Sequence, residues 1–100
     1  MSAKRFVTNE KATIEIYGIN ASIHARMINL STTGAAFRFL AEKFIPNKGD
    51  LLNIRVTLPA IAKVRVLDAE VVWINGPQIG VCFINKDEVV EKMMSRGPRL

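Results

Sequence analysis

Hydrophobic and polar residues alternate along most of this chain, and a period of two is typical of strands that bury one face. Six stretches show it: ATIEIYG, SIHARMI, AAFRFL, LLNIRVTLP, KVRVLDAEVVWI and QIGVCFI. Residues 18–21 form the natural hairpin turn between the first two stretches. The phase of the fifth stretch slips near Leu67 and Asp68, which predicts a bulge or bend there. The pattern places the following side chains on the buried faces: Ala12, Ile14, Ile16, Ile23, Ala25, Met27, Ala35, Phe37, Phe39, Leu52, Ile54, Val56, Leu58, Ile79, Val81 and Phe83.

The period changes in the last part of the chain, NKDEVVEKMMSR. Its apolar residues recur at helical spacing: Val89, Val90, Met93 and Met94. Asn85 is suited to cap a helix, and Glu88 three residues later gives a start that resembles a capping box. Gly97 and Pro98 end it. The spacing therefore predicts a helix over about residues 86–95, with its methionines packed in the core.

Short strands with one apolar face each, followed by one helix, predict a mainly all-β fold. The expected architecture is a six-stranded antiparallel β-barrel with one C-terminal α-helix. One hundred residues are enough for one hydrophobic core, so we expect residues 1–100 to form a single domain. Within it, residues 1–11 are expected to be a basic N-terminal arm and residues 12–84 the barrel.

The composition favours a folded protein, and its charge suits either an anionic partner or a surface kept basic for solubility. Hydrophobic residues make up 49% of the chain and charged residues 23%, which is typical of globular domains. The net charge of +5 suits a phosphate ligand, a nucleic acid or an acidic protein surface, and does not choose among them. No apolar run reaches the roughly 18 residues of a membrane span, and the N-terminus has no secretory signal. With a single cysteine as well, we expect a cytoplasmic protein without membrane insertion.

The side chains that serve most often in catalysis are scattered along the sequence. His24 lies on the polar face of a strand, without a carboxylate or a second histidine at ligand spacing. Cys82 is expected to be a buried or half-buried thiol. Trp73 is either a core residue or an exposed stacking platform, and a core position is the expectation. No phosphate loop, paired-carboxylate signature or nucleophile elbow is present, so we expect no enzyme, no catalytic residue and no metal site. Binding of single-stranded nucleic acid is disfavoured, because only Tyr17 and Trp73 could serve as stacking platforms.

Two segments have the chemistry of ligand binding. In NLSTTG, Asn29 and Ser31 can bond nearby backbone N–H groups and hold a sharp turn, and Gly34 can adopt a positive φ or allow a close approach. In AKRF, Lys4 and Arg5 precede the first strand, and a guanidinium can bind an anion or the O6 and N7 edge of guanine. A plain strand connection and a solvated terminus are the alternatives for these two segments.

With these segments the chain resembles the PilZ domain family, whose members typically bind the bacterial second messenger cyclic di-GMP. The family motif (D/N)-x-S-x-x-G matches NLSTTG at Asn29, Ser31 and Gly34. The VVW strand, the IGVCF strand and the following helix also resemble the family in their order, and the resemblance covers roughly residues 4–94. It implies a six-stranded barrel in which Asn29, Ser31 and the Gly34 backbone lie beside one guanine and its phosphate.

The chain departs from a second family motif, R-x-x-x-R in the N-terminal arm, because no two of its arginines are four residues apart. Lys4 and Arg5 are adjacent cations instead. In the family the two arginines clamp phosphates and guanines, and lysine does not replace a bidentate guanidinium. A charge-assisted hydrogen bond contributes about 1.5–3 kcal/mol, so one missing arginine weakens binding about tenfold or more. The sequence leaves open whether Arg26, Arg38 or Arg55 reaches the ligand from a strand.

The resemblance implies a regulatory receptor for cyclic di-GMP that signals through a separate protein partner. Its ligand-binding residues would be Lys4, Arg5, Asn29, Ser31 and Gly34, and it needs no cofactor. The rival hypothesis is a degenerate PilZ-like adaptor that binds protein and not nucleotide, and its motivation is the broken arginine pair. In that case the turn residues are structural, and the helix or an exposed strand edge binds the partner.

Overall fold

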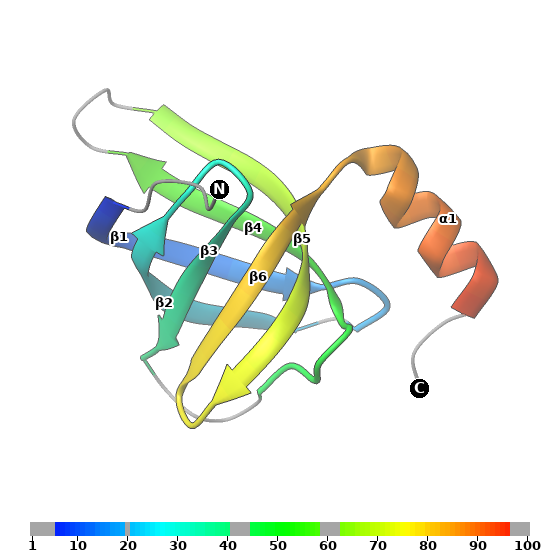
Figure 1. The fold of residues 1–100 in the computed structure, drawn as a ribbon, viewed down its shortest axis with the longest axis horizontal. Helices are drawn as coiled ribbons and strands as arrows, with labels where there is room; N and C mark the ends of the chain where they lie inside the picture. The colour runs from blue at the N-terminus through cyan, green and yellow to red at the C-terminus, as the bar shows by residue number, and fades with distance from the viewer. Residues whose placement is uncertain (1–5, 20, 41–44, 59–62, 97–100) are drawn as a thin grey trace.

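The computed structural model describes residues 6–19, 21–40, 45–58 and 63–96. Its elements are β1 (Phe6–Ile16), β2 (Ser22–Leu30), β3 (Gly34–Phe39), β4 (Leu51–Leu58), β5 (Lys63–Asn75), β6 (Gln78–Ile84) and α1 (Lys86–Arg96). The strands close a barrel in the order β1-β2-β3-β6-β5-β4, and neighbouring strands are antiparallel (Figure 1). The predicted six-stranded antiparallel barrel with one C-terminal helix is confirmed.

The residues that the alternation placed inward fill the inside of the barrel. Each of these side chains that the structure describes is buried, except Phe83, which is half-buried and packs against the core. Phe37, Ile14 and Leu52 are among the largest side chains fully removed from water. Because successive strand residues point to opposite faces, this core leaves the outer face of every strand for other side chains.

β1 begins at Phe6, inside the segment that was expected to be an arm at residues 1–11. The first two residues of β1 pair with the last two residues of β2. The register of this pair then shifts between Val7 and Glu10. Such a bulge breaks the period of two, which explains why the alternation alone did not place residues 6–11 in the barrel.

The bulge predicted near Leu67 and Asp68 is wrong in position. The β4–β5 register is continuous through both residues, and the irregularity of β5 lies between Val71 and Trp73, where this strand pairs with β6. The cause is the first half of β5, whose two valines face outward and are 59% and 56% exposed. In the sequence, these outward valines make the apolar residues of β5 appear to change faces near Leu67. The backbone register does not change there.

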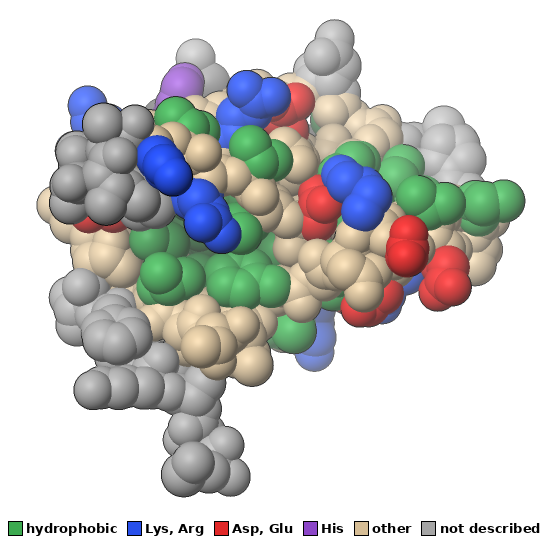
Figure 2. Space-filling view, turned by 90° about the horizontal axis from the view of Figure 1, so that it is seen from above, with side chains coloured by type: hydrophobic (Ala, Val, Ile, Leu, Met, Phe, Trp, Pro, Cys, Tyr) green, Lys and Arg blue, Asp and Glu red, His purple; other side chains and the backbone are tan. Residues whose placement is uncertain are grey.

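α1 begins after Asn85, whose side-chain oxygen accepts a hydrogen bond from the backbone N–H of Glu88 at 2.8 Å, as the predicted cap requires. The helix projects from the end of β6 beside the barrel (Figure 1). Its one buried residue is Val89. Met94 is 81% exposed and Val90 is 50% exposed, so the expected packing of the methionines in the core is wrong for Met94. Acidic and hydrophobic side chains gather at this end of the molecule (Figure 2).

Candidate functional site

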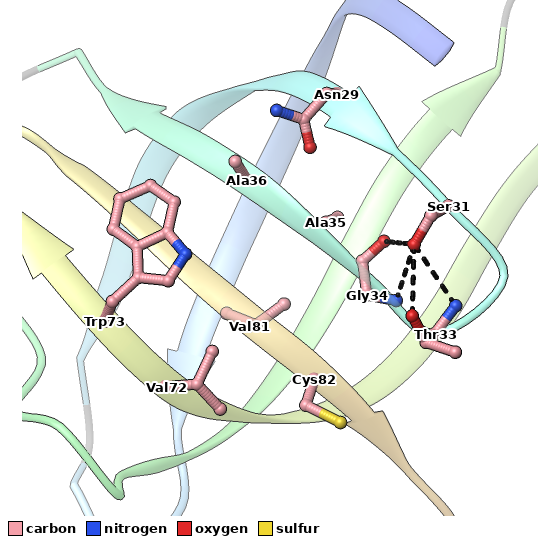
Figure 3. A pocket seen from close by; sticks show the side chains of 10 residues that line it. All are labelled: Asn29, Ser31, Thr33, Gly34, Ala35, Ala36, Val72, Trp73, Val81 and Cys82. Atoms are coloured by element: carbon pink, nitrogen blue, oxygen red, sulfur yellow. Dashed lines mark hydrogen bonds between the residues drawn. The ribbon is translucent and has the colours of Figure 1, made fainter. Parts of the chain in front are cut away.

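The NLSTTG segment forms the β2–β3 turn, and Ser31 holds this turn together (Figure 3). The backbone N–H of Ser31 donates to the Gly34 carbonyl at 2.9 Å. The Ser31 hydroxyl oxygen accepts hydrogen bonds from the backbone N–H groups of Thr33 at 3.3 Å and Gly34 at 3.2 Å. The turn is also tied to β6, because the Phe83 N–H donates to the Thr33 carbonyl at 2.8 Å. Ser31 therefore uses its polar atoms to fix the shape of the turn.

Gly34 is required at this position by the close approach of β6. A Cβ atom on Gly34 would overlap the backbone carbonyl oxygen of Val81. Among the described glycines, positive φ occurs at Gly18, Gly49 and Gly76, and Gly34 has none. Of the two reasons that the sequence offered for this glycine, the structure therefore supports the close approach of another group.

The side chain of Asn29 differs from that of Ser31, because it makes no hydrogen bond to a described residue. It is half-buried and lines a pocket of about 180 Å³ beside the turn (Figure 3). A side-chain amide offers both hydrogen-bond donors and an acceptor. Within the motif, Asn29 is therefore the residue with polar atoms available to a ligand.

A row of four residues, directly opposite one another on neighbouring strands, crosses the outer face of β2, β3, β6 and β5. In order it consists of Asn29, Ala36, Gly80 and Trp73. The two middle residues are small and the two outer ones are large, so the row forms a shallow trough. A Cβ on Gly80 would collide with the Trp73 indole, which shows that the ring lies directly over this glycine. In Figure 3 the indole stands on the side of the pocket opposite the turn.

Trp73 and Cys82 are two corrections to the sequence-based expectations. Trp73, expected in the core, is 38% exposed and lines the pocket. Cys82, expected to be at least half-buried, is exposed and lines the same pocket. Both lie on the outer face, Trp73 because the register of β5 shifts just before it and Cys82 because it is opposite Gly34. Gly80 was the available signal for this site, because a glycine inside a strand often marks a close approach.

Two arginines lie on strands beside the site, and neither of them lines the pocket. Arg26 of β2 and Arg38 of β3 are directly opposite each other, on strands that also form the trough. Arg55 lies on β4 opposite Thr13 of β1, three strands away from Arg38 around the barrel, and it lines a different pocket together with Lys11. The predicted arm residues Lys4 and Arg5 lie outside the described residues.

Polar contacts to Asp68 fasten the start of α1 to the barrel. The Asp68 carboxylate accepts hydrogen bonds from the Tyr17 hydroxyl at 2.6 Å and the Asn53 amide at 3.1 Å, and it forms an ion pair with Lys86 at 3.0 Å. Burial acts to raise the pKa of Asp68, but the hydrogen bonds from Tyr17, Asn53 and Lys86 outweigh this effect and the pKa is lowered. The carboxylate therefore contributes to folding in its charged form.

A second carboxylate fastens the rest of the helix. Glu70 forms ion pairs with Lys92 at 2.8 Å and Arg96 at 3.3 Å, and Arg96 also donates to the Gly49 carbonyl at 2.6 Å. The pKa of Glu70 is lowered, mainly by the hydrogen bond from Lys92. Desolvation acts to raise this pKa, and the hydrogen bond from Arg96 lowers it further. Glu70 is opposite Cys82 on β6, so the helix is tied to a strand position next to the pocket.

Other groups with catalytic or metal-binding potential do not assemble in the part of the chain that the structure describes. His24 is exposed on β2, as predicted. No cluster of three or more His, Cys, Asp or Glu side chains suited to a metal ion is found among the described residues. The described helix is neither long nor apolar enough to cross a membrane.

Comparison with solved structures shows where this architecture recurs. The PilZ domain of CeSA from a cellulose-synthesizing bacterium aligns with a TM-score of 0.70 and 14% identity, over 94% of this chain and 93% of that chain. The Bacillus subtilis inhibitor of motility, MotI/DgrA, aligns with a TM-score of 0.66 and 17% identity, over 99% of this chain and 53% of that chain. An uncharacterized Legionella protein aligns with a TM-score of 0.51 and 18% identity, over 93% and 89% of the two chains. At these identities the likeness shows a shared fold.

The family itself follows from the sequence comparison. No curated protein sequence matches the chain. The profile of the PilZ domain, however, matches residues 2–96. This match covers almost the whole chain, and it includes the β2–β3 turn, the trough and the helix. The protein therefore belongs to the PilZ domain family.

Proposed function

We propose that this protein is a regulatory, non-enzymatic receptor for cyclic di-GMP and that a separate protein partner recognises its bound form. Membership of a family whose members typically bind this nucleotide supports the proposal. The observation that carries it is the trough beside the turn, which joins a free amide at Asn29 to an exposed indole at Trp73. These two groups supply the contacts that a guanine base needs.

The chemistry of the trough suits one purine ring. The exposed face of the Trp73 indole offers a stacking surface. Stacking on an aromatic side chain depends little on which base it is, so a guanine can stack there. The Asn29 amide can donate to and accept from the edge of the ring. Ala36 lines the floor of the pocket, and Gly80 lets the indole lie close to the barrel, so the trough stays shallow enough for a flat ligand. In this proposal Ser31 and Gly34 act by fixing the turn against which the ligand and its phosphate rest.

The proposal gives Lys4 and Arg5 the role of closing over the ligand. Val7 of β1 pairs with Asn29 of β2, so the chain enters the barrel next to the pocket. Arg5 precedes Val7 by two residues and Lys4 by three. At this distance along the chain both cations can reach an anion bound beside Asn29.

The same contacts suggest how a partner detects the ligand. The hydrogen bond from Phe83 to the Thr33 carbonyl joins the turn to the end of β6. Two residues further along the chain, Asn85 caps α1. A ligand bound against the turn would therefore lie close to the start of the helix, whose position it could change and whose exposed side includes Val90 and Met94.

Calorimetry tests the receptor proposal. Cyclic di-GMP is titrated into the wild-type protein, with GMP as the control ligand. We expect saturable heat for cyclic di-GMP and about tenfold weaker binding for Asn29→Ala, because the amide contacts to the base are lost. Thr32→Ala, at an exposed position of the same turn, is the matched control and should bind like the wild type. Absence of heat from a folded wild-type protein would contradict the proposal.

A second candidate function is a nucleotide-independent adaptor. The observation that supports it is that the Ser31 hydroxyl already accepts hydrogen bonds from two backbone N–H groups of the turn. The motif therefore stabilises the fold even without a ligand. The binding surface would be the exposed side of α1 around Val90 and Met94, and not Val89, which is buried. This function predicts partner binding that Met94→Asp abolishes and that cyclic di-GMP leaves unchanged.

A further inference from the structure

A row of three cations crosses the outer face of the barrel next to the trough. Lys11 of β1 is opposite Arg26 of β2, and Arg26 is opposite Arg38 of β3. Arg38 lies two residues after Ala36, so the two share a face of β3 and their Cα atoms are about 7 Å apart. We call these three residues the cationic row. Arg38 does not line the pocket itself, but an extended arginine side chain spans this distance, so its guanidinium can reach a ligand that extends from the trough beyond Ala36.

The row contains no compensating carboxylate. On β6 the residue opposite Arg38 is Gln78. None of the described residues that flank the row on the same outer face is a carboxylate: they are Asn9, Thr13, His24, Ala36, Leu40, Arg55 and Gly80. Like charges directly opposite each other destabilise a sheet. The pairing of Arg26 with Arg38 therefore lacks a stabilising role within the described fold, and an anion bound there would relieve the repulsion.

The two arginines of this pair are held differently. A terminal nitrogen of Arg26 donates to the Asn9 carbonyl at 2.9 Å, so Arg26 fixes the bulge through which β1 leads back to the arm. Arg38 is exposed and makes no hydrogen bond or ion pair to a described residue. All five of its N–H donors are therefore available, and a guanidinium binds phosphate oxygens in a bidentate way.

We propose that Arg38 binds a phosphate at the end of the trough away from the turn, and that it takes, from a strand, the role of one arginine missing from the arm. Arg26 and Lys11 add positive charge beside it. The inference rests on the proposed function for the identity of the ligand, a guanine-containing phosphodiester. The subsite itself recognises the phosphate group next to a purine held in the trough.

The test compares Arg38→Gln with Arg55→Gln, which removes an equal charge three strands away around the barrel. Affinity for cyclic di-GMP is measured by calorimetry at low and high salt. We expect Arg38→Gln to bind about tenfold more weakly or worse and to show a reduced salt dependence, because a charge-assisted contact is lost. Arg38→Lys should recover only part of the affinity, because lysine is a point charge. Equal affinities for Arg38→Gln and Arg55→Gln would overturn the inference and leave the receptor intact.

A second titration separates failure of the subsite from failure of the receptor. Pyrophosphate is added to ¹⁵N-labelled wild-type protein, and the backbone amide signals of Arg38 and Gln78 are followed. Saturable shifts that Arg38→Gln abolishes would support the subsite even if cyclic di-GMP did not bind. Absence of both these shifts and cyclic di-GMP binding would overturn the subsite and the receptor together.

Discussion

The β2–β3 turn and helix α1 are attached to neighbouring positions on the strands of the barrel, but different interactions hold them. The turn is fixed by short-range hydrogen bonds to Ser31 and by the contact between the Gly34 and Val81 backbones. The helix is fastened by ion pairs from Lys92 and Arg96 to Glu70, and it buries Val89 alone. The first arrangement is rigid and independent of salt, whereas the second depends on charges that are partly exposed.

This difference fits a receptor in which the ligand side is preorganised and the output side is adjustable. Asn29 lies on β2, paired with Val7 and Ala36, and beside a turn that its own hydrogen bonds hold, so a ligand would have little to order there. A helix held by ion pairs can change its position at a small cost in free energy. The two regions meet at β6, where Cys82 is opposite both Gly34 and Glu70.

Gly34→Ala should give the largest loss of stability. The new Cβ would meet a backbone carbonyl that no side-chain rotation can move, so we expect a loss of about 2 kcal/mol or more in the free energy of unfolding. Chemical denaturation measures it, with Thr32→Ala as the control in the same turn. A loss no greater than that of the control would show that the turn is not rigid.

Trp73→Ala should weaken cyclic di-GMP binding roughly ten- to a hundredfold, because stacking contributes about 1–3 kcal/mol per base. Trp73→Phe keeps an aromatic face over Gly80 and should retain most of the affinity. Calorimetry measures both variants. Unchanged affinity in the alanine variant would place the base elsewhere on the barrel.

Ser31→Ala should cost about 1 kcal/mol in the free energy of unfolding, because one hydroxyl accepts two N–H bonds in the turn. Thr33→Ala leaves those two N–H bonds in place and is the matched control. If Ser31→Ala left stability unchanged but removed nucleotide binding, the serine would contact the ligand directly and would not be needed to stabilise the turn.

Glu70→Gln should cost less than about 1 kcal/mol, because its ion pairs are partly exposed. The pKa of Glu70 is lowered in the folded protein, so the contribution of the carboxylate is complete above its ordinary pKa of about 4 and is lost as the pH falls below it. Wild-type stability should therefore fall more steeply than that of Glu70→Gln between neutral and acidic pH. Parallel pH profiles from thermal denaturation would contradict this attachment of the helix.

The sequence was sufficient for the fold because its inward residues follow a local rule. In each strand, apolar residues such as Ile14, Phe37 and Ile54 alternate with polar ones. A closed barrel buries the apolar faces of all the strands together. The errors occurred where the pairing of strands matters more than the order of residues. The outward valines of β5 imitated a bulge, and the register shift before Trp73 moved that residue to the surface.

The site was predictable in part for the same reason. The motif located the turn and its three residues, since side chain to backbone bonding within four residues is a local property. Ala36, Gly80 and Trp73 come together only through strand pairing, which no spacing along the chain shows. The hydrogen bonds in the structure were also needed to show that Ser31 stabilises the turn, whereas the Asn29 amide lines the pocket.

The most direct test of the receptor at this site uses the single tryptophan of the chain. In a ¹⁵N-labelled sample, Trp73 gives one indole N–H signal, and this ring lines the pocket. The account predicts that cyclic di-GMP shifts this signal saturably, together with the amide signals of Gly34 and Gly80, and that GMP at the same concentrations does not. An indole signal that stays in place while the protein remains folded, at concentrations well above those of the nucleotide in cells, would contradict it.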